Sequence, residues 1–411
     1  MSRTVPFPLP RMGIDNVSHE TQLKAGWVRN AVNVDISASG AFRRRRGYRL
    51  LAAGDFHSLW RNPVTGMVMA CRGDEVCIIG AAGKVFPVAR LPSADPISFC
   101  EHNGTTYWAH AKGCGRIRPG EAIGRAVGVP STWYEVLRES PGNLPPGRYG
   151  VSTTAVDEFG EESAASPVEI IEVKAGGITV AGLQADAPIV RVYITDANGE
   201  VLRMAIEAPA GLPVYTVADP ASGGELDTRQ LAPLPGGQLI TGHAGRVFVA
   251  RGSSLCFSNA MRPHLWEPAH GYVEFTGRIS MLASVADGVY VGDDRGVWFL
   301  SGLDAEKFTM RRVSVVPAMD RSMVVVEATA FDEKVVPSRL PVVVWATVEG
   351  FKVGQAGGDV VDLNASQVRL ARGAGKSAYV MQDGVKQVIS LLKSGLSAVG
   401  SAEDSQTLFK E

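Results

Sequence analysis

A short pattern of apolar and polar positions recurs along the chain and is clearest between residues 277 and 302. Apolar residues alternate ahead of a polar turn at residues 293–296, and a second apolar run follows at residues 297–300. Period-two apolar spacing that is rich in β-branched and aromatic residues and interrupted by Asp and Gly is typical of a β-hairpin. This stretch therefore predicts two antiparallel strands joined by a tight turn.

The same pattern occurs six times, beginning at Met67, Thr106, Val247, Val289, Val342 and Ala378. Neighbouring copies mostly lie roughly 35 to 55 residues apart, which is the spacing of four-stranded propeller blades. Between the second and third copies there are about ninety extra residues. We predict an all-β fold, a six-bladed β-propeller whose third blade begins only after an inserted domain.

The inserted segment has its own strand pattern. Tyr149 opens a run of alternating residues that ends in a polar turn at residues 157–163, and a later hairpin turns at Asn198 and Gly199. Several short strands in under about a hundred residues predict a small β-sandwich. Tyr149 and the phrase from Glu158 to Ser163 resemble a fibronectin type III module, and proline-rich linkers flank the segment.

These patterns divide the chain into five parts. Residues 1–50 form an N-terminal arm and an arginine-rich hairpin, and residues 51–132 form the first part of the propeller. Residues 133–232 form the inserted β-sandwich, residues 233–395 the second part of the propeller, and residues 396–411 a C-terminal tail. The prolines near the start favour an extended arm with little structure of its own.

The most unusual chemistry lies in the arginine-rich hairpin. Val32, Val34 and Ile36 alternate, residues 37–40 make a turn, and the return strand carries four consecutive arginines, Arg43, Arg44, Arg45 and Arg46. Consecutive residues of a strand point to opposite faces, so no single surface holds all four. They could protect an exposed edge strand, bind acidic groups of a neighbouring subunit, or contact DNA phosphates.

This region resembles a known family. The phrases Gly13-Ile14-Asp15-Asn16, Arg29 to Asp35 and Arg43 to Tyr48 are similar to the N-terminal region of the nozzle, or tail-stabilisation, proteins of short-tailed phages. In that family an asparagine-rich strand, a small turn and an Arg-Arg-x-Gly return precede a β-propeller. The subunit-interface residues that the resemblance implies are Asn33, Asp35, Arg43, Arg44, Arg45 and Arg46.

The resemblance implies a structural virion protein of a phage tail, assembled in the cytoplasm of the bacterial host. Several copies, six by analogy with the family, would form a ring around the DNA ejection channel. Adaptor and fibre proteins of the tail would be its neighbours, and DNA would pass through the lumen without sequence recognition. No membrane insertion is expected.

Composition narrows these possibilities. Lys plus Arg number 41 against 42 Asp plus Glu, a formal net charge of −1, so no overall attraction to nucleic acid or membrane is implied. No apolar run is long enough to span a membrane, and the start of the chain has no secretion signal. An odd count of five cysteines argues against a disulfide framework and favours buried thiols.

The main rival function is a carbohydrate-binding or glycoside-hydrolysing β-propeller, because such enzymes use paired carboxylates. Acidic residues crowd one region at Glu267, Glu274, Asp287, Asp293 and Asp294. Asp beside Gly is, however, favoured in turns for backbone reasons alone, and no nucleophile elbow is present. The tryptophans mostly fall on strands, which favours blade packing over a sugar platform.

Two further motifs have ordinary structural explanations beside functional ones. Cys100, His102, His110 and Cys114 could form a zinc site, but their spacing matches no common finger. Residues 373–377 look like the end of a phosphate-binding loop, yet the first Gly of the motif is missing and a strand follows where a helix is required. We therefore expect no enzyme activity, no cofactor and no metal.

Overall fold

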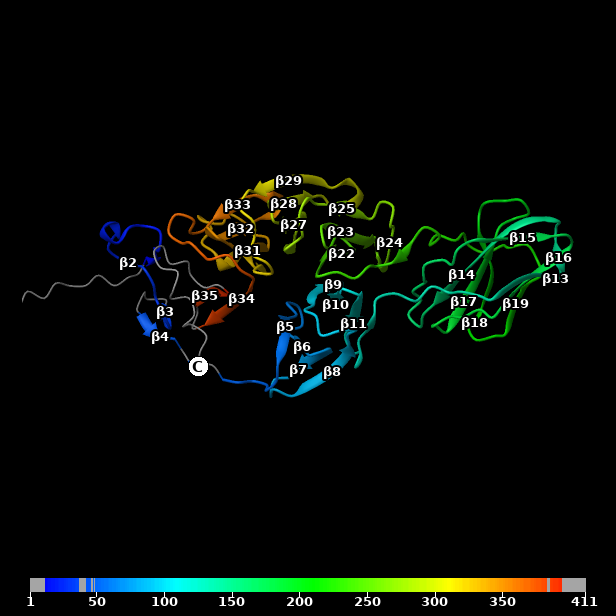
Figure 1. The fold of residues 1–411 in the computed structure, drawn as a ribbon, viewed down its shortest axis with the longest axis horizontal. Coiled ribbons are helices and arrows are strands. Elements are labelled where there is room, and N and C mark those ends of the chain that lie inside the picture. Colours follow the sequence, from blue (N-terminus) through cyan, green and yellow to red (C-terminus); the bar gives the residue numbers. More distant parts are fainter. Residues whose placement is uncertain (1–11, 37–41, 46, 48, 383–384, 394–411) are drawn as a thin grey trace, which may run out of the picture.

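The computed structural model describes residues 12–36, 42–45, 47, 49–382 and 385–393. The fold is all β, as the sequence predicts, and consists of a propeller with an inserted β-sandwich (Figure 1). Within the described ranges the helical elements are short 3-10 turns: η1 (Glu20–Gln22), η2 (Ala305–Lys307), η3 (Ala328–Ala330) and η4 (Ala356–Gly358). None of the helices described is long and apolar enough to cross a membrane.

The propeller consists of six antiparallel sheets that follow one another along the chain. The first two contain β5 (Phe56–Arg61), β6 (Val68–Arg72), β7 (Glu75–Ile79) and β8 (Val85–Arg90), then β9 (Ser98–His102), β10 (Thr105–His110), β11 (Gly113–Ile117) and β12 (Arg125–Ala126). The third contains β20 (Ala232–Pro233), β21 (Leu239–His243), β22 (Arg246–Arg251), β23 (Ser254–Asn259), β24 (Arg262–Trp266) and β25 (Tyr272–Glu274).

The last three sheets complete this series. The fourth contains β26 (Met281–Val285), β27 (Gly288–Asp293), β28 (Gly296–Ser301) and β29 (Thr309–Ser314). The fifth contains β30 (Val324–Val326), β31 (Val342–Thr347), β32 (Gly350–Gly354) and β33 (Val360–Asp362), and the sixth contains β34 (Gly375–Gln382) and β35 (Val385–Leu392). The sixth sheet therefore has two strands in the described part of the chain, whereas the other five have at least four.

Each of the six repeated patterns forms a hairpin within its own sheet. The hairpins are β6–β7, β10–β11, β22–β23, β27–β28, β31–β32 and β34–β35. Along the chain, the third sheet comes after the inserted domain, as predicted. The local pattern identifies these strands because their apolar residues are buried on both faces, between neighbouring sheets.

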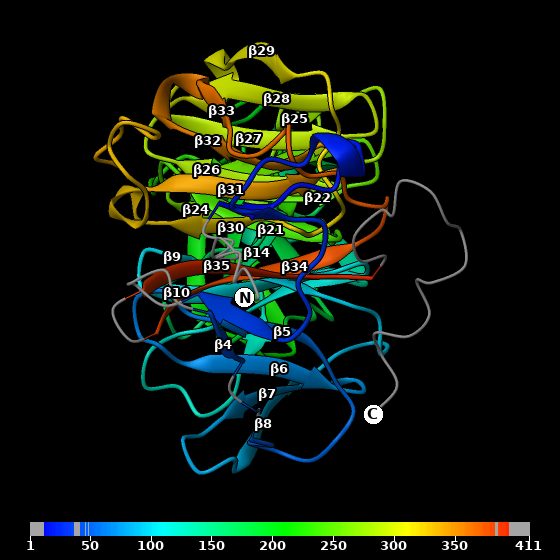
Figure 2. The ribbon, with the colours of Figure 1, turned by 90° about the vertical axis from the view of Figure 1, so that its left-hand side faces the viewer.

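The first strands of the sheets lie side by side around a common axis. β9, β21, β26, β30 and β34 contact one another in that order. β5 joins β9 through the backbone N–H of Ile97, which donates to the Ser58 hydroxyl at 2.9 Å. Aromatic pairs fill the spaces between sheets: Trp60 stacks on Phe99 with ring centroids 5.6 Å apart. Figure 2 shows the sheets from the end that carries the N-terminal segment.

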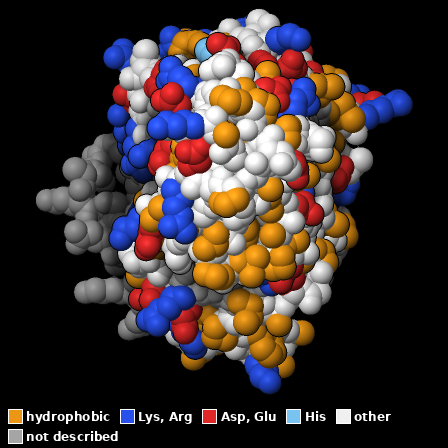
Figure 3. Space-filling view, turned by 90° about the vertical axis from the view of Figure 1, so that its right-hand side faces the viewer, with side chains coloured by type: hydrophobic (Ala, Val, Ile, Leu, Met, Phe, Trp, Pro, Cys, Tyr) orange, Lys and Arg blue, Asp and Glu red, His pale blue; other side chains and the backbone are white. Residues whose placement is uncertain are grey.

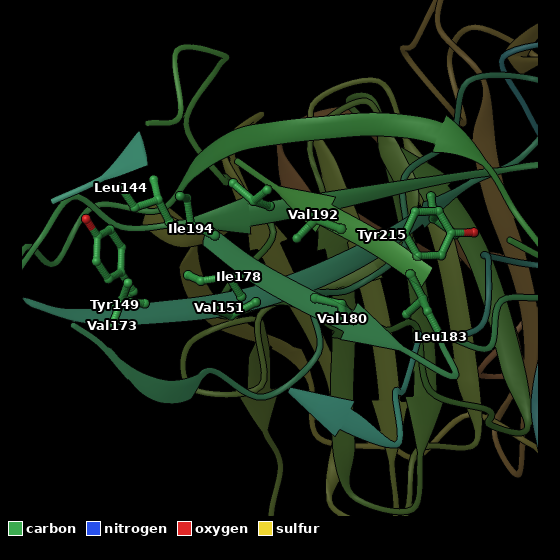
Figure 4. Close-up of a cluster of buried hydrophobic side chains, with 12 residues drawn as sticks. Leu144, Tyr149, Val151, Val173, Ile178, Val180, Leu183, Val192, Ile194 and Tyr215 are labelled. Atoms are coloured by element: carbon green, nitrogen blue, oxygen red, sulfur yellow. The ribbon is translucent and has the colours of Figure 1, made fainter. Parts of the chain in front are cut away.

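The inserted domain is a β-sandwich of a three-stranded and a four-stranded sheet. The sheets are β13 (Val136–Leu144), β16 (Gly176–Ala181) and β19 (Val214–Val217), facing β15 (Glu169–Val173), β14 (Gly147–Val156), β17 (Ile189–Ile194) and β18 (Arg203–Pro209). Their facing apolar side chains, among them Tyr149, Ile178 and Val192, form one buried core (Figure 4). The domain projects from the propeller between β12 and β20 (Figure 1).

The N-terminal segment has more structure than an extended arm. β1 (Gly13–Ile14) pairs in parallel with β2 (Trp27–Val28), and β3 (Val34–Ile36) pairs with β4 (Phe42–Arg44). Asn16, 6% exposed, ties the segment to the other end of the chain. Its amide nitrogen donates to the carbonyl of Arg369 at 2.8 Å, and its amide oxygen accepts from the backbone N–H of Arg369 at 2.7 Å.

Replacing Asn16 is expected to release this segment. Asn16→Ala leaves the part-buried N–H and C=O of Arg369 without these partners, which costs about 1 to 3 kcal/mol, and residues 12–28 should exchange their amide hydrogens faster. Asn143→Ala is the matched control, because its amide contacts Asp219 at an exposed site. Equal protection of residues 12–28 in wild type and Asn16→Ala, measured by hydrogen-exchange mass spectrometry, would contradict the role given to Asn16.

Candidate subunit interface

The predicted interface residues lie on the β3–β4 hairpin, and its register determines how their side chains point. Val34 pairs with Arg44, and Asp35 pairs with Arg43. Beyond the strands, the backbone N–H of Arg45 donates to the carbonyl of Asn33 at 2.9 Å. Because side chains alternate along a strand, Arg44 is exposed while Arg43 and Arg45 are half-buried.

Two members of the predicted set need separate comment. Asn33 is exposed and has a backbone φ of 58°, the left-handed conformation that asparagine tolerates better than most residues. It therefore has a conformational role at the entry to β3, besides any contact it makes. Arg46 lies outside the described residues. The structure thus brings Asn33, Asp35 and three of the four arginines onto one small hairpin.

The hairpin region exposes apolar side chains next to these cations. The exposed fractions of the two valines beside the arginines are 58% for Val32 and 36% for Val34. Two paired strands of three residues each are marginal in water without further packing. Exposed apolar surface that adjoins arginine is the composition of a protein interface.

The hairpin and the sandwich lie at opposite ends of the molecule (Figure 1). Figure 3 shows the sandwich end, where apolar side chains gather over part of the surface. Exposed apolar side chains of this domain include Val136, Ile170, Val201, Leu212 and Val214. One chain therefore exposes apolar side chains at both ends of its long axis.

A second arginine cluster, which the sequence analysis did not single out, fixes the sandwich to the propeller. We call it the clasp; it contains Arg116, Arg118 and Arg125 of the propeller and Asp157, Glu158, Phe159 and Glu161 of the sandwich. Arg116 donates to Glu161 Oε1 at 2.6 Å and lies 3.5 Å from Asp157 Oδ2, and Arg118 donates to the same Oε1 at 2.8 Å.

Phe159 lies at the centre of the clasp. Guanidinium carbons of Arg116, Arg118 and Arg125 lie 5.7, 4.4 and 5.0 Å from the centroid of its ring. Cations are attracted to the negative face of an aromatic ring within about 6 Å. Arg125 also pairs with Glu158. The turn at residues 157–163 is thus an inter-domain contact as well as a turn.

The third sheet adds a histidine to this contact. His264, on β24, bonds through Nε2 to the carbonyl of Glu162 at 3.0 Å, and its Nδ1 lies 3.9 Å from Glu161 Oε2. Burial lowers the pKa of His264, although the charge of Glu161 opposes this effect. The sequence contains the acidic residues within 157–162 and the arginines within 116–125, but it does not show that they pair. Their pairing depends on the fold.

Three of the five acidic residues of the rival glycosidase hypothesis form structural hydrogen bonds. Asp293 is buried, and its Oδ1 accepts from the backbone N–H groups of Arg295 and Gly296 at 2.8 and 3.0 Å. Asp287 accepts from the N–H of Gly357 at 2.8 Å, joining the fourth sheet to η4. Glu274 accepts from Ser254. These contacts account for three of the five carboxylates without a substrate.

The motif of Cys100, His102, His110 and Cys114 lies on the strands β9, β10 and β11 of the second sheet. All five cysteines are free and buried, and burial raises the pKa of Cys114 to about 12. His110 contacts Ser93 through Nε2 at 3.0 Å. Among the described residues no group of three or more His, Cys, Asp or Glu is arranged to hold a metal ion.

Comparison with known proteins gives matches of low similarity to solved structures. No protein-family profile and no curated protein matches this chain. Among solved structures it is similar to BBS1N in complex with ARL6DN, at 12% identity over 84% of this chain and 91% of that chain, with a TM-score of 0.32. It is also similar to apo AztD from Citrobacter koseri, at 9% identity over 75% and 70%, with a TM-score of 0.29.

A third similar structure is the Pan2 WD40 domain of Neurospora crassa, at 12% identity over 82% of this chain and 86% of that chain, with a TM-score of 0.29. At identities and TM-scores this low, the likeness says nothing about partners or activity. The assignment of the fold rests on the sheets described above.

Proposed function

We propose that this chain is a structural protein of a short-tailed phage tail, in which several copies form a ring around the DNA channel. The observation that carries the proposal is the β3–β4 hairpin. It is too short to be stable alone, it exposes Arg44 together with Val32 and Val34, and it lies within the segment that resembles the nozzle family. Six copies follow from the resemblance alone.

Such a protein acts through the way in which its copies and their domains are arranged in the ring. The hairpin of one copy contacts acidic and apolar groups of a neighbour, since a guanidinium suits carboxylates in bidentate geometry. The propeller forms the wall, and the clasp holds the sandwich in a fixed direction at the far end, toward fibre proteins. A chain with a net charge of −1 suits a conduit, because a strongly basic wall would retain DNA through many phosphate contacts.

The test is incorporation into particles. We expect wild-type chain to co-purify with phage particles at a fixed, low copy number relative to the capsid protein, measured by quantitative mass spectrometry. Arg44→Glu should reduce incorporation at least about tenfold, because reversing a charge in a close pair costs several kcal/mol. Arg339→Glu, at an exposed position of the propeller between η3 and β31, is the matched control and should be incorporated normally.

Deleting residues 1–50 extends the same test. Incorporation should be abolished while circular dichroism still shows a folded β-protein, because the clasp and the six sheets lie outside the deleted segment. Normal incorporation of the deletion variant would overturn the role of the hairpin. Absence of the wild-type chain from particles would overturn the tail function itself.

A further inference from the structure

An apolar cavity lies between the fifth and sixth sheets. It is lined by Val344, Phe351 and Leu363 on the side of the fifth sheet, by Tyr379 and Val388 on the side of the sixth, and by Phe331 next to η3. Its volume is about 210 Å³. An apolar cavity of about 150 Å³ already holds a benzene-sized molecule, so this one has room for a single aromatic ring.

The cavity lies where the sixth sheet covers only part of the fifth. The fifth sheet has four strands, whereas the sixth has β34 and β35 in the described part of the chain. Phe351, on β32, is half-buried, although Val344, on β31, is 1% exposed. The ammonium of Lys386 in the cavity wall already donates to the carbonyl of Thr329. The lining therefore suits an uncharged, apolar group.

The N-terminal segment is attached beside this cavity (Figure 1). Asn16 is bonded to Arg369, and its backbone N–H donates to the carbonyl of Gln367 at 2.9 Å. Gln367 and Arg369 lie in the loop that joins β33 to β34, and Leu363 of the cavity belongs to the same loop. Pro10 precedes Asn16 by about 20 Å of fully extended chain. The residues before Met12 are therefore attached within reach of the cavity.

The sequence of residues 5–10 fits an aromatic-lined cavity. Val5, Phe7 and Leu9 alternate there with prolines, and these residues lie outside the described ranges. Proline restricts its own φ and the conformation of the residue before it, so such a segment loses little conformational entropy when it binds. Proline-rich segments typically bind grooves lined by aromatic side chains. The cavity has three of these, in Phe331, Phe351 and Tyr379.

We propose that this cavity binds residues 5–10 of the same chain, with the ring of Phe7 as the group that enters it. One aromatic ring matches the volume of the cavity, and its apolar surface matches the lining. The attachment at Asn16 keeps the segment at a high effective concentration near the cavity. This inference goes beyond the proposed function and does not depend on it, because it concerns contacts within one chain.

The first test traps the contact as a disulfide in the full-length protein. Val5→Cys and Leu9→Cys, on either side of Phe7, are each combined with Gln387→Cys in the cavity wall. At least one pair should form an intramolecular disulfide on mild oxidation, detected by peptide mass spectrometry, because the five native cysteines are buried. The matched control replaces Gln387→Cys by Lys307→Cys, at an exposed position of η2, and should stay reduced. Failure of both pairs, equal oxidation of the control, or a disulfide between two chains would overturn the proposal.

A second test leaves the native cysteines as they are. Phe7→Ala should speed trypsin cleavage after Arg11 about 10- to 100-fold, because the burial of one aromatic ring is lost and proteolysis follows the population of the released segment. Ala330→Phe fills the cavity from its own wall and should have the same effect with Phe7 in place. Circular dichroism would confirm that both variants keep their β content. Cleavage at the wild-type rate in both folded variants would contradict binding of Phe7 in the cavity.

Discussion

Glu161→Ala is expected to lower the free energy of unfolding by about 3 to 5 kcal/mol, because it leaves a buried cation without its closest partner. Arg116 has a side-chain exposure of 3%, and Glu161 one of 14%. After the substitution, Asp157 at 3.5 Å is the remaining carboxylate next to Arg116. Arg118 also loses an ion-pair partner. Urea denaturation followed by tryptophan fluorescence measures the loss.

The matched control for this substitution is Asp74→Ala. Asp74 pairs with Arg90 at 2.7 Å, but the side chain of Arg90 is 81% exposed, and exposed pairs contribute at most about 1 kcal/mol. A double variant, Arg116→Met with Glu161→Ala, should be more stable than Glu161→Ala alone, because replacing a buried pair by apolar groups is often neutral. A double variant less stable than Glu161→Ala would refute this account of the clasp.

Trp345→Ala is expected to cost about 3 to 5 kcal/mol, the usual range for truncating a buried aromatic side chain. Trp345, on β31, is fully buried, and its ring centroid lies 5.7 Å from that of Tyr290 on β27. The two rings fill the space between the fourth and fifth sheets. Their loss leaves a cavity that the rigid strands cannot close. Thermal and urea unfolding of the purified protein would measure the effect.

Two further tryptophan substitutions make this test specific. The indole Nε1 of Trp345 has no hydrogen-bond partner in the described part of the chain, so Trp345→Phe removes an unpaired polar group along with some apolar contact. It should cost about 1 to 2 kcal/mol, less than Trp345→Ala. Trp133→Ala, at a side chain that is 57% exposed, should change stability by at most about 0.5 kcal/mol. Equal losses for all three would contradict packing as the cause.

The strands of the propeller were predictable because their signal is local. A run such as Val289 to Asp293 alternates or stays apolar within a few residues, and the following turn needs Asp and Gly for backbone reasons. The same reasoning recognised the sandwich as an insertion. For the sixth sheet the pattern predicted one hairpin, and among the described residues β34 and β35 form it.

The candidate interface was predicted partly from residues and partly from resemblance. Alternation along β4 follows from strand geometry, and the structure shows Arg44 exposed with Arg43 and Arg45 half-buried. That Asn16 binds Arg369, a residue 353 positions away, was not predictable. The segment that the sequence assigned to an extended arm lies against its own propeller at this point.

The amino-acid sequence alone thus specifies the hairpins, their number and the place of the insertion, since strand period and turn chemistry act over neighbouring residues. It does not specify the clasp or the anchoring of Asn16. Each of these joins groups that are distant in the chain, and their contact energies exist only once the sheets are arranged around the axis. The same residues would be solvated and unremarkable in an unfolded chain.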